Sequence, residues 1–136
     1  MEPLRIAQVC RVAPPSRGGM EAVVSGLSRA LSARGHDVVV AAPEVGPIEG
    51  VRTVRTFRRG PSAYPWTTGL LDAVQGRDVV HVHGIDAQVD WLVATRAWHG
   101  AAVGVSTHGA LLHRPRWRRG KRLWLRAITR HTLRRA

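Results

Sequence analysis

Short apolar runs alternate with helix-like stretches along most of the chain. The apolar runs occupy residues 6–9, 36–42, 78–84 and 101–107, and glycine or proline bounds most of them. Runs of this length and composition are typical of strands buried in a parallel sheet. Residues 51–57 alternate imperfectly between apolar and polar side chains. This weaker pattern predicts a strand at the edge of the sheet.

Helical periodicity appears between these runs. One helix is predicted to begin after Gly18 and Gly19 and to end at Gly35, where a glycine is expected after a helix C-terminus. Its predicted buried stripe comprises Met20, Val23, Val24, Leu27, Ala30 and Leu31. A second helix, over residues 86–98, is predicted to bury Val89, Leu92, Val93 and Ala97. A short helix over residues 66–75 is predicted to place Trp66, Leu70 and Val74 on one face.

The order of these elements predicts an α/β fold. Strands that alternate with helices form a parallel sheet with helices on both faces, because the crossover connections are right-handed. We therefore expect a Rossmann-like, doubly wound parallel sheet of about five strands in the order 3-2-1-4-5. Ligands bind such sheets at the carboxyl ends of the strands, where the strand order reverses. The expected crevice lies between the first and fourth strands.

Charge divides the chain into two parts. The net charge is +12 at pH 7, and residues 114–136 hold 10 of the 21 lysines and arginines and none of the 9 acids. We therefore expect residues 1–113 to form the nearly neutral α/β body and residues 114–136 to form a basic amphipathic helix of the same domain. The predicted apolar stripe of that helix comprises Leu123, Trp124, Ala127, Ile128 and Thr132, with Leu133 at its margin. Arg122, Arg126 and Arg130 form a separate row at i, i+4 spacing.

A basic helix with tryptophans beside leucines suits an anionic membrane surface better than nucleic acid. The residues predicted to contact a membrane are Arg116, Trp117, Arg118, Arg119, Lys121, Arg122 and Trp124. Alternatively, the apolar face packs on the sheet and the arginines point into solvent. The single cysteine, Cys10, and the absence of an apolar run of 18 residues predict a cytoplasmic protein, peripheral at most on the inner face of the cell membrane.

The glycine pair at the start of the first helix is one candidate site. Gly18 and Gly19 lack the third glycine of the dinucleotide-binding fingerprint, which disfavours NAD. Paired glycines at a helix start let backbone N–H groups approach a phosphate, but they also serve in turns that need a positive φ. Glu21, in the first helical turn, is accounted for equally well by the helix dipole.

Three histidines form the second candidate site. His81 and His83 share one face of the fourth strand near its carboxyl end, and His108 follows the fifth strand. The first two, with Asp86, have a spacing that metal ligands can use, but no cysteine or glutamate cluster supports a metal and none is expected. His108 could donate to a phosphate or a sugar hydroxyl, act as a base, or cap the sheet edge through a backbone hydrogen bond.

Four motifs in this order resemble the N-terminal half of a family-4 glycosyltransferase with the GT-B fold. They are PPSRGGME at residues 14–21, LSARGHDVVV at 31–40, DVVHVHG at 78–84 and STHG at 106–109. The resemblance implies transfer of a sugar from a nucleotide-sugar donor to a lipid-linked or polysaccharide acceptor, with neither a metal nor another cofactor.

The resemblance also implies roles for individual residues. Gly18 and Gly19 would meet the donor diphosphate, and His108 would be the catalytic histidine near the reacting sugar. His83 and Glu21 would line the acceptor cleft. The family's C-terminal nucleotide-sugar domain is absent from these 136 residues. We therefore expect the incomplete N-terminal half of a GT-B fold, inactive alone, which is either a truncated product or a half that works with a separately encoded partner.

Two other interpretations stay open on the sequence. The arginine-rich helix could make the chain a binding module for an anionic membrane or for nucleic acid, although the body shows no nucleic-acid motif. The chain could also be a fragment of a sugar-nucleotide epimerase, which shares the GT-B fold. That enzyme would need acidic groups in the crevice, and the sequence offers none there.

Overall fold

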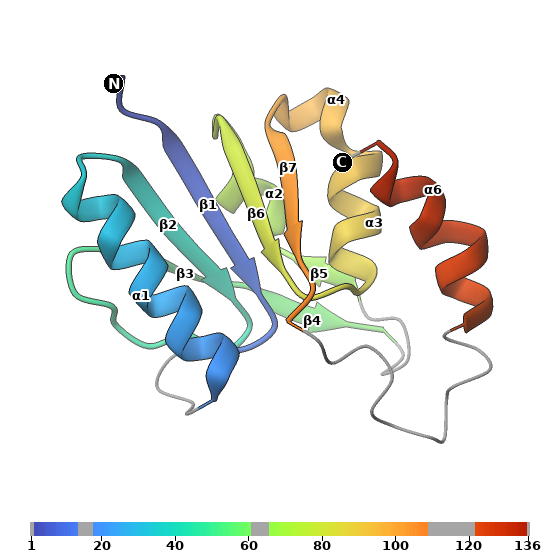
Figure 1. Cartoon of the computed structure of the whole chain (residues 1–136), viewed down its shortest axis with the longest axis horizontal. Coiled ribbons are helices and arrows are strands. Elements are labelled where there is room, and N and C mark those ends of the chain that lie inside the picture. The colour runs from blue at the N-terminus through green and yellow to red at the C-terminus, as the bar shows by residue number, and fades with distance from the viewer. Residues whose placement is uncertain (1, 14–17, 61–65, 109–121, 136) are drawn as a thin grey trace.

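A five-stranded parallel sheet forms the centre of the molecule (Figure 1). The computed structural model describes residues 2–13, 18–60, 66–108 and 122–135. The strands of the sheet are β1 (Arg5–Cys10), β2 (Asp37–Ala42), β3 (Arg52–Arg55), β6 (Val79–His83) and β7 (Ala102–Ser106). Their spatial order is β3-β2-β1-β6-β7. This is the predicted 3-2-1-4-5 order, and the Rossmann-like α/β fold is confirmed.

Helices cover both faces of the sheet (Figure 1). Helix α1 (Gly19–Ala33) packs on one face, and α2 (Leu70–Val74) and α3 (Ala87–Ala94) pack on the other. The short helix α4 (Arg96–His99) follows α3. Near the C-terminus, a π-helical turn η2 (Leu125–Thr129) continues into α6 (Arg130–Leu133), and both lie against α3.

The core consists of two apolar clusters, one on each face of the sheet. Because side chains alternate along a strand, neighbouring residues of β1 point into different clusters. Val9 joins the cluster under α2 and α3, where Leu70, Val89 and Leu92 are fully buried. The smaller cluster under α1 comprises Cys10, Ala13, Val24, Val40, Ala42 and Ile48.

Helix α1 buries a narrower stripe than the sequence predicts. Val24 and Ser28, at i and i+4, form the buried centre of the contact. Val23 is 48% exposed and Ala30 is also exposed, so the prediction that both are buried is wrong. Val23 lies about 100° around the helix from Val24, which turns it away from the sheet.

The predicted helix over residues 66–75 is wrong in its first half. Residues Trp66–Thr68 form β5, which pairs antiparallel with β4 (Phe57–Arg59) in a separate two-stranded sheet. Phe57 therefore leaves the main sheet, whose edge strand ends at Arg55. Gly69 adopts φ +78 and separates β5 from α2. Glycine permits this left-handed conformation, and aromatic and threonine side chains favour the extended pairing before it.

Two further helix predictions need correction. The helix over residues 86–98 breaks at Thr95, whose hydroxyl donates to the Trp91 carbonyl at 2.8 Å, and Ala97 is exposed. The predicted stripe of the C-terminal helix is not covered as a whole, because Leu123 is 69% exposed and Ile128 46%. The π-helical turn widens the spiral and shifts the residues after it away from α-helical spacing.

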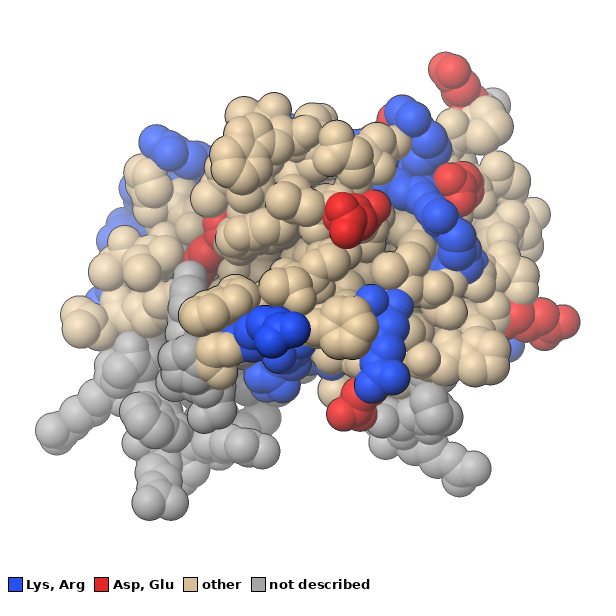
Figure 2. All heavy atoms as spheres, turned by 180° about the vertical axis from the view of Figure 1, so that it is seen from behind, with Lys and Arg blue, Asp and Glu red and all other residues tan. Residues whose placement is uncertain are grey.

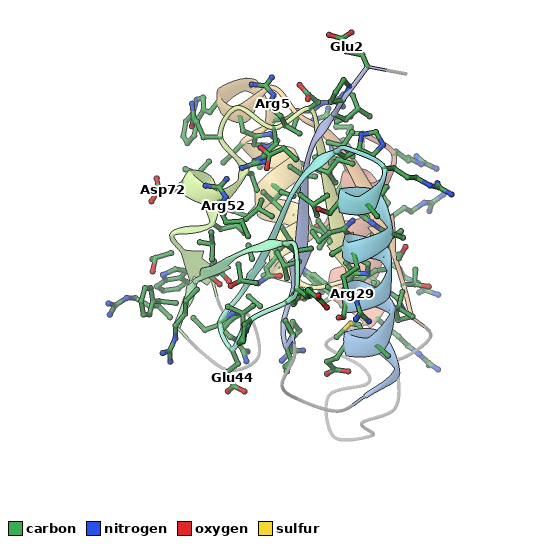
Figure 3. The ribbon with its side chains drawn as sticks, turned by 90° about the vertical axis from the view of Figure 1, so that its left-hand side faces the viewer. Glu2, Arg5, Arg29, Glu44, Arg52 and Asp72 are labelled. Atoms are coloured by element: carbon green, nitrogen blue, oxygen red, sulfur yellow. The ribbon has the colours of Figure 1, made fainter. Side chains whose placement is uncertain are left out.

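Ion pairs lie at the amino ends of the strands, opposite the end where ligands bind such sheets. Arg5 forms a forked interaction with Asp78, with Nη2 2.8 Å from Oδ1 and the backbone N–H 2.7 Å from Oδ2. Arg77 Nη1 lies 2.8 Å from Asp37 Oδ2. Figure 3 shows Arg5 near one end of the strands and Glu44 at the other. The first strand is thereby fixed at its amino end, and its carboxyl end is left to the candidate site.

Candidate functional site

Polar side chains from three strands meet at the carboxyl ends of β1, β6 and β7. The parallel register places Gln8 beside His81 and places His83 beside Ser106. His108 follows the end of β7, and its ring stacks on that of His83 with the centroids 5.1 Å apart. The structure therefore brings together the histidines that the sequence singles out.

A hydrogen-bonded chain runs from the interior to the surface. His83 Nε2 lies 2.6 Å from Gln8 Oε1, and His83 Nδ1 lies 2.8 Å from His108 Nε2. Gln8 is 1% exposed and His83 is 2% exposed, whereas His108 is an exposed residue. His83 therefore lies beneath the surface of the protein and is connected to it through His108.

A second pair lies beside this chain. His81 Nε2 is 2.8 Å from Ser106 Oγ, and the His81 and His83 rings are 4.1 Å apart between centroids. The Gly84 N–H donates to the Ser106 carbonyl at 2.7 Å, which ties the ends of β6 and β7 together. The strand ends that carry the histidines thus form a linked unit.

Burial keeps the inner histidine neutral. Burial, with smaller effects from the neighbouring His81 and His108, lowers the pKa of His83 to about 3. The pKa of His81 is also lowered, mainly by burial and then by His108. A neutral imidazole has one donor nitrogen and one acceptor nitrogen. His83 can therefore link an acceptor on one side to a donor on the other.

The backbone of His108 is strained. Among the described residues it is the one non-glycine residue with a positive φ, at 46°. A left-handed conformation costs a non-glycine residue about 1–2 kcal/mol, and such residues are concentrated at functional sites. The hydrogen bond to His83 holds the ring in this position.

The glycine pair opens α1 without a side-chain cap. Gly18 has φ −163 and ψ 170, which is extended backbone, so a turn with positive φ is not the reason for glycine there. The carboxylate of Glu21 folds back over Gly18 and occupies the space where a Cβ would lie. A Cβ at Gly19 would meet nothing within 4 Å. Residues 14–17 of this loop lie outside the described part of the chain.

A partly buried carboxylate, that of Asp86, lies near the end of β6. Asp86 Oδ1 accepts from the Gln88 N–H at 2.8 Å and so caps α3, and its Oδ2 lies 3.8 Å from Arg11 Nε. Burial raises the pKa of Asp86. The hydrogen bond from the Gln88 N–H and the charges of Arg11 and Arg58 lower it by less, so the pKa is raised on balance. Within the described segments, no three His, Cys, Asp or Glu side chains form a group that could hold a metal ion. His81, His83 and Asp86 therefore do not form the metal site that their spacing allows.

The described part of the C-terminal helix carries two of the residues predicted to contact a membrane. Arg122 is exposed and Trp124 is half-buried. Arg116, Trp117, Arg118, Arg119 and Lys121 lie outside the described residues. No helix in the described segments has the length and apolar character to cross a bilayer.

Comparison with known proteins identifies the family. The sequence model of glycosyltransferase family 4 matches residues 17–136. The chain belongs to glycosyltransferase family 4. The sequence resemblance is thereby confirmed, and so is the assignment of this chain to the glycosyltransferases.

Curated relatives are longer than this family-4 chain. A GDP-mannose:cellobiosyl-diphosphopolyprenol alpha-mannosyltransferase of Xanthomonas campestris is 34% identical over 142 residues, which cover 93% of this chain and 37% of that protein. Enzymes of the same name from Xanthomonas oryzae pv. oryzae and Komagataeibacter xylinus are 36% and 33% identical over 140 residues. The chain spans about 37% of the length of these relatives. The Rossmann-like fold and this coverage fit a partial GT-B fold.

Proposed function

We propose that this chain is the acceptor-side portion of a glycosyltransferase that moves mannose from GDP-mannose to a lipid-linked oligosaccharide. The observation that carries the proposal is the strained His108, held at the strand ends by the buried His83. The site lies where ligands bind doubly wound sheets. The relatives' names supply the donor and the class of acceptor.

In this proposal, His108 contacts the reacting sugar and His83 holds it in place. During transfer, the bond from the anomeric carbon to the diphosphate oxygen breaks, a bond to an acceptor hydroxyl oxygen forms, and the proton of that hydroxyl passes to the leaving diphosphate. His108 accepts a hydrogen bond from a hydroxyl of the bound sugars and so orients them for the reaction. Glu21 belongs to the acceptor cleft in this assignment, at the opening of α1.

The donor diphosphate is assigned to the start of α1. A helix N-terminus presents its first backbone N–H groups and the positive end of the helix dipole to an anion, and Gly18 supplies no side-chain cap at the start of α1. Gly19 leaves room for a phosphate to approach the backbone. In this proposal the helix terminus stabilises the leaving diphosphate without a metal ion or another cofactor. The nucleotide pocket is assigned to the part of the relatives that this chain does not span. A single gene or two separate genes could encode that part and the present chain.

A lipid-linked acceptor brings the enzyme to a membrane surface, and we assign the contact to the C-terminal helix. The exposed Leu123 and Ile128 lie among Arg122, Arg126 and Arg130 there. Aromatic and aliphatic side chains with arginines bind the interface of anionic lipids. The face shown in Figure 2 carries separate basic groups with acidic side chains between them, and this pattern suits a membrane less well. In this proposal the protein is cytoplasmic and peripheral.

The family match and the relatives' names favour transfer over the alternatives. The relatives are named as transferases and not as epimerases. No observation favours nucleic acid as a partner of this chain.

Binding of an acceptor analogue tests the proposal directly. The probe is cellobiosyl diphosphate carrying a short, water-soluble prenyl chain, titrated into the ¹⁵N-labelled chain. We expect amide shifts at Glu21, Gly84 and His108, the residues that the proposal places at or beside the acceptor. Saturating probe without shifts, or shifts confined to Arg5 and Asp78 at the amino ends, would overturn the assignment.

A further inference from the structure

Gln8 is a polar residue in a strand of otherwise apolar residues between Ile6 and Cys10. Its side chain is 1% exposed and lies on the α1 face of the sheet. Burying an amide without a hydrogen bond costs several kcal/mol, roughly 2–7 depending on the reference state. Gln8 avoids this cost through the 2.6 Å contact of its Oε1 with His83 Nε2, across 75 residues of sequence. The amide oxygen therefore acts on His83.

The amide oxygen decides where His83 carries its proton. A carbonyl oxygen only accepts hydrogen bonds, so the proton of the neutral His83 ring lies on Nε2. Its Nδ1 is then an acceptor, and it faces His108 Nε2 at 2.8 Å. His108 must supply the proton of that hydrogen bond from its own Nε2.

The remaining nitrogen of His108 is thereby fixed as well. When its Nε2 carries the proton, the Nδ1 of the neutral ring has a free lone pair. His108 is an exposed residue, and in this inference its Nδ1 is the nitrogen offered to a ligand. A neutral acceptor binds a hydroxyl that donates a hydrogen bond, and it disfavours a phosphate oxygen, which has no proton to give.

We infer that Gln8 is a positioning residue that sets the tautomers of His83 and His108, so that His108 presents Nδ1 as an acceptor for a sugar hydroxyl. The role of the hydroxyl rests on the proposed function, whereas the tautomers do not. The neighbouring His81 does not interrupt the chain, because its Nε2 is paired with Ser106 at 2.8 Å.

Ring nitrogen shifts measure the proposed tautomers without any substrate. Two-bond ¹H–¹⁵N correlation spectra of the 136-residue chain at pH 7.5 distinguish protonated from unprotonated ring nitrogens. We expect His83 and His108 each to show a protonated Nε2 and an unprotonated Nδ1. The exposed His131 provides the internal reference for a ring on the surface. A proton on Nδ1 of either His83 or His108 would overturn the inference.

Two substitutions separate positioning from packing. Gln8→Glu keeps an oxygen acceptor at this point, so His83 Nε2 should stay protonated; because the added carboxylate also favours a charged His83, only this nitrogen is compared with the parent. Gln8→Met keeps the length of the side chain but removes the acceptor, so the His108 shifts should move toward those of His131. Gln88→Met removes another buried amide, one that donates to Thr67 Oγ1 at 3.0 Å, and should leave both rings unchanged.

A folded Gln8→Met protein with unchanged His83 and His108 ring nitrogen shifts would overturn the inference. Shift changes in the Gln88→Met control as large as those in Gln8→Met would also overturn it. If Gln8→Met does not fold, the parent spectrum still decides, because a proton on Nδ1 of either histidine there contradicts the assignment. These readouts need no sugar and no transfer. A failed acceptor titration with the expected tautomers would count against the proposed function alone.

Discussion

His83 Nδ1 lies 2.8 Å from His108 Nε2, and this contact joins the buried end of β6 to the exposed residue after β7. The His83 ring is held in the interior by Gln8, and His108 is exposed at the carboxyl edge of the sheet. The position of the surface histidine therefore depends on the buried one. The first two predictions follow from this arrangement.

Replacing His83 by phenylalanine should destabilise the fold. The ring volume is largely kept, but Gln8 Oε1 and His108 Nε2 lose their shared partner. Leaving a buried polar group unsatisfied costs about 1–3 kcal/mol, measurable by urea unfolding monitored by circular dichroism. His131→Phe, on the exposed side of α6, should stay within about 0.5 kcal/mol of the parent. Equal stability of His83→Phe and the parent would contradict the account.

The His83→Phe protein should also lose less stability on mild acidification. The folded state holds the pKa of His83 at about 3, below its ordinary 6.5, so the unfolded chain binds more protons in this range. In the parent protein, the contribution of His83 to the free energy of unfolding is fully present above pH 6.5. This contribution falls as the pH drops toward 3, by up to about 1.4 kcal/mol per pH unit for one proton. His81, Asp78 and Asp86 titrate in both proteins, so the difference in slope isolates His83. The measurement is the free energy of unfolding in urea at several pH values between 6.5 and 5. Equal slopes against pH for His83→Phe and the parent would refute this prediction.

Asp37→Ala should destabilise the amino end of the sheet. The Arg77 side chain is 7% exposed, and the substitution removes its carboxylate partner while the Asp37 side chain itself is 56% exposed. Breaking a buried pair costs 3–5 kcal/mol, and solvent screening of the exposed partner reduces this to about 1–3 kcal/mol. Glu44→Ala, at an exposed position, is the matched control. A loss within 0.5 kcal/mol of that control in urea unfolding would show that the pair contributes little.

Cys10, the single cysteine, should react slowly with thiol reagents in the folded protein. Burial, with a smaller effect from Glu21, raises its pKa to about 12, and its side chain is fully buried. At pH 8 we expect labelling at least about a hundredfold slower than in urea, because reaction requires opening of the strand end. A Cys10→Ala, Ala22→Cys protein places the thiol on the exposed side of α1 and should label rapidly. Native labelling of Cys10 at that rapid rate would mean that this end of β1 is open.

Membrane binding should depend on the arginines of the C-terminal helix. Arg122, Arg126 and Arg130 are exposed, and each arginine near an anionic surface contributes about 1 kcal/mol. Replacing all three by glutamine should weaken sedimentation with phosphatidylglycerol-containing vesicles by roughly a hundredfold. The control removes the same charge elsewhere, through glutamine at the exposed positions 29, 34 and 52. Equal losses in the two proteins would assign the binding to net charge alone.

The fold was predictable because buried parallel strands leave continuous apolar runs. Residues 36–42 and 78–84 show such runs, and the strands β2 and β6 follow them closely. Trp66 is predicted in a helix but lies in β5. Its i, i+4 spacing with Leu70 is typical of a helix, but a strand followed by a turn at Gly69 gives the same spacing. The exposure of Val23 depends on how α1 crosses the sheet, and the local pattern does not specify that angle.

Part of the site was predictable for a related reason. The histidines at positions 83 and 108 come at the ends of predicted parallel strands, and such ends meet at one edge of a sheet. Gln8 was visible as a polar residue in an apolar run, but its partner is 75 positions away and is set by the register between β1 and β6. The burial of His83 beneath His108 likewise depends on that register.

Transfer by a chimera tests the central claim most directly. The stretch of the Xanthomonas campestris mannosyltransferase that matches this chain is replaced by the present residues, and mannose transfer from GDP-mannose to cellobiosyl-diphosphopolyprenol is measured. We expect the chimera to transfer mannose, and its His108→Ala variant to lose about a hundredfold or more in kcat/KM, while His131→Ala changes little. A folded chimera that transfers no mannose, or one in which His108→Ala is as active as its parent, would contradict the account.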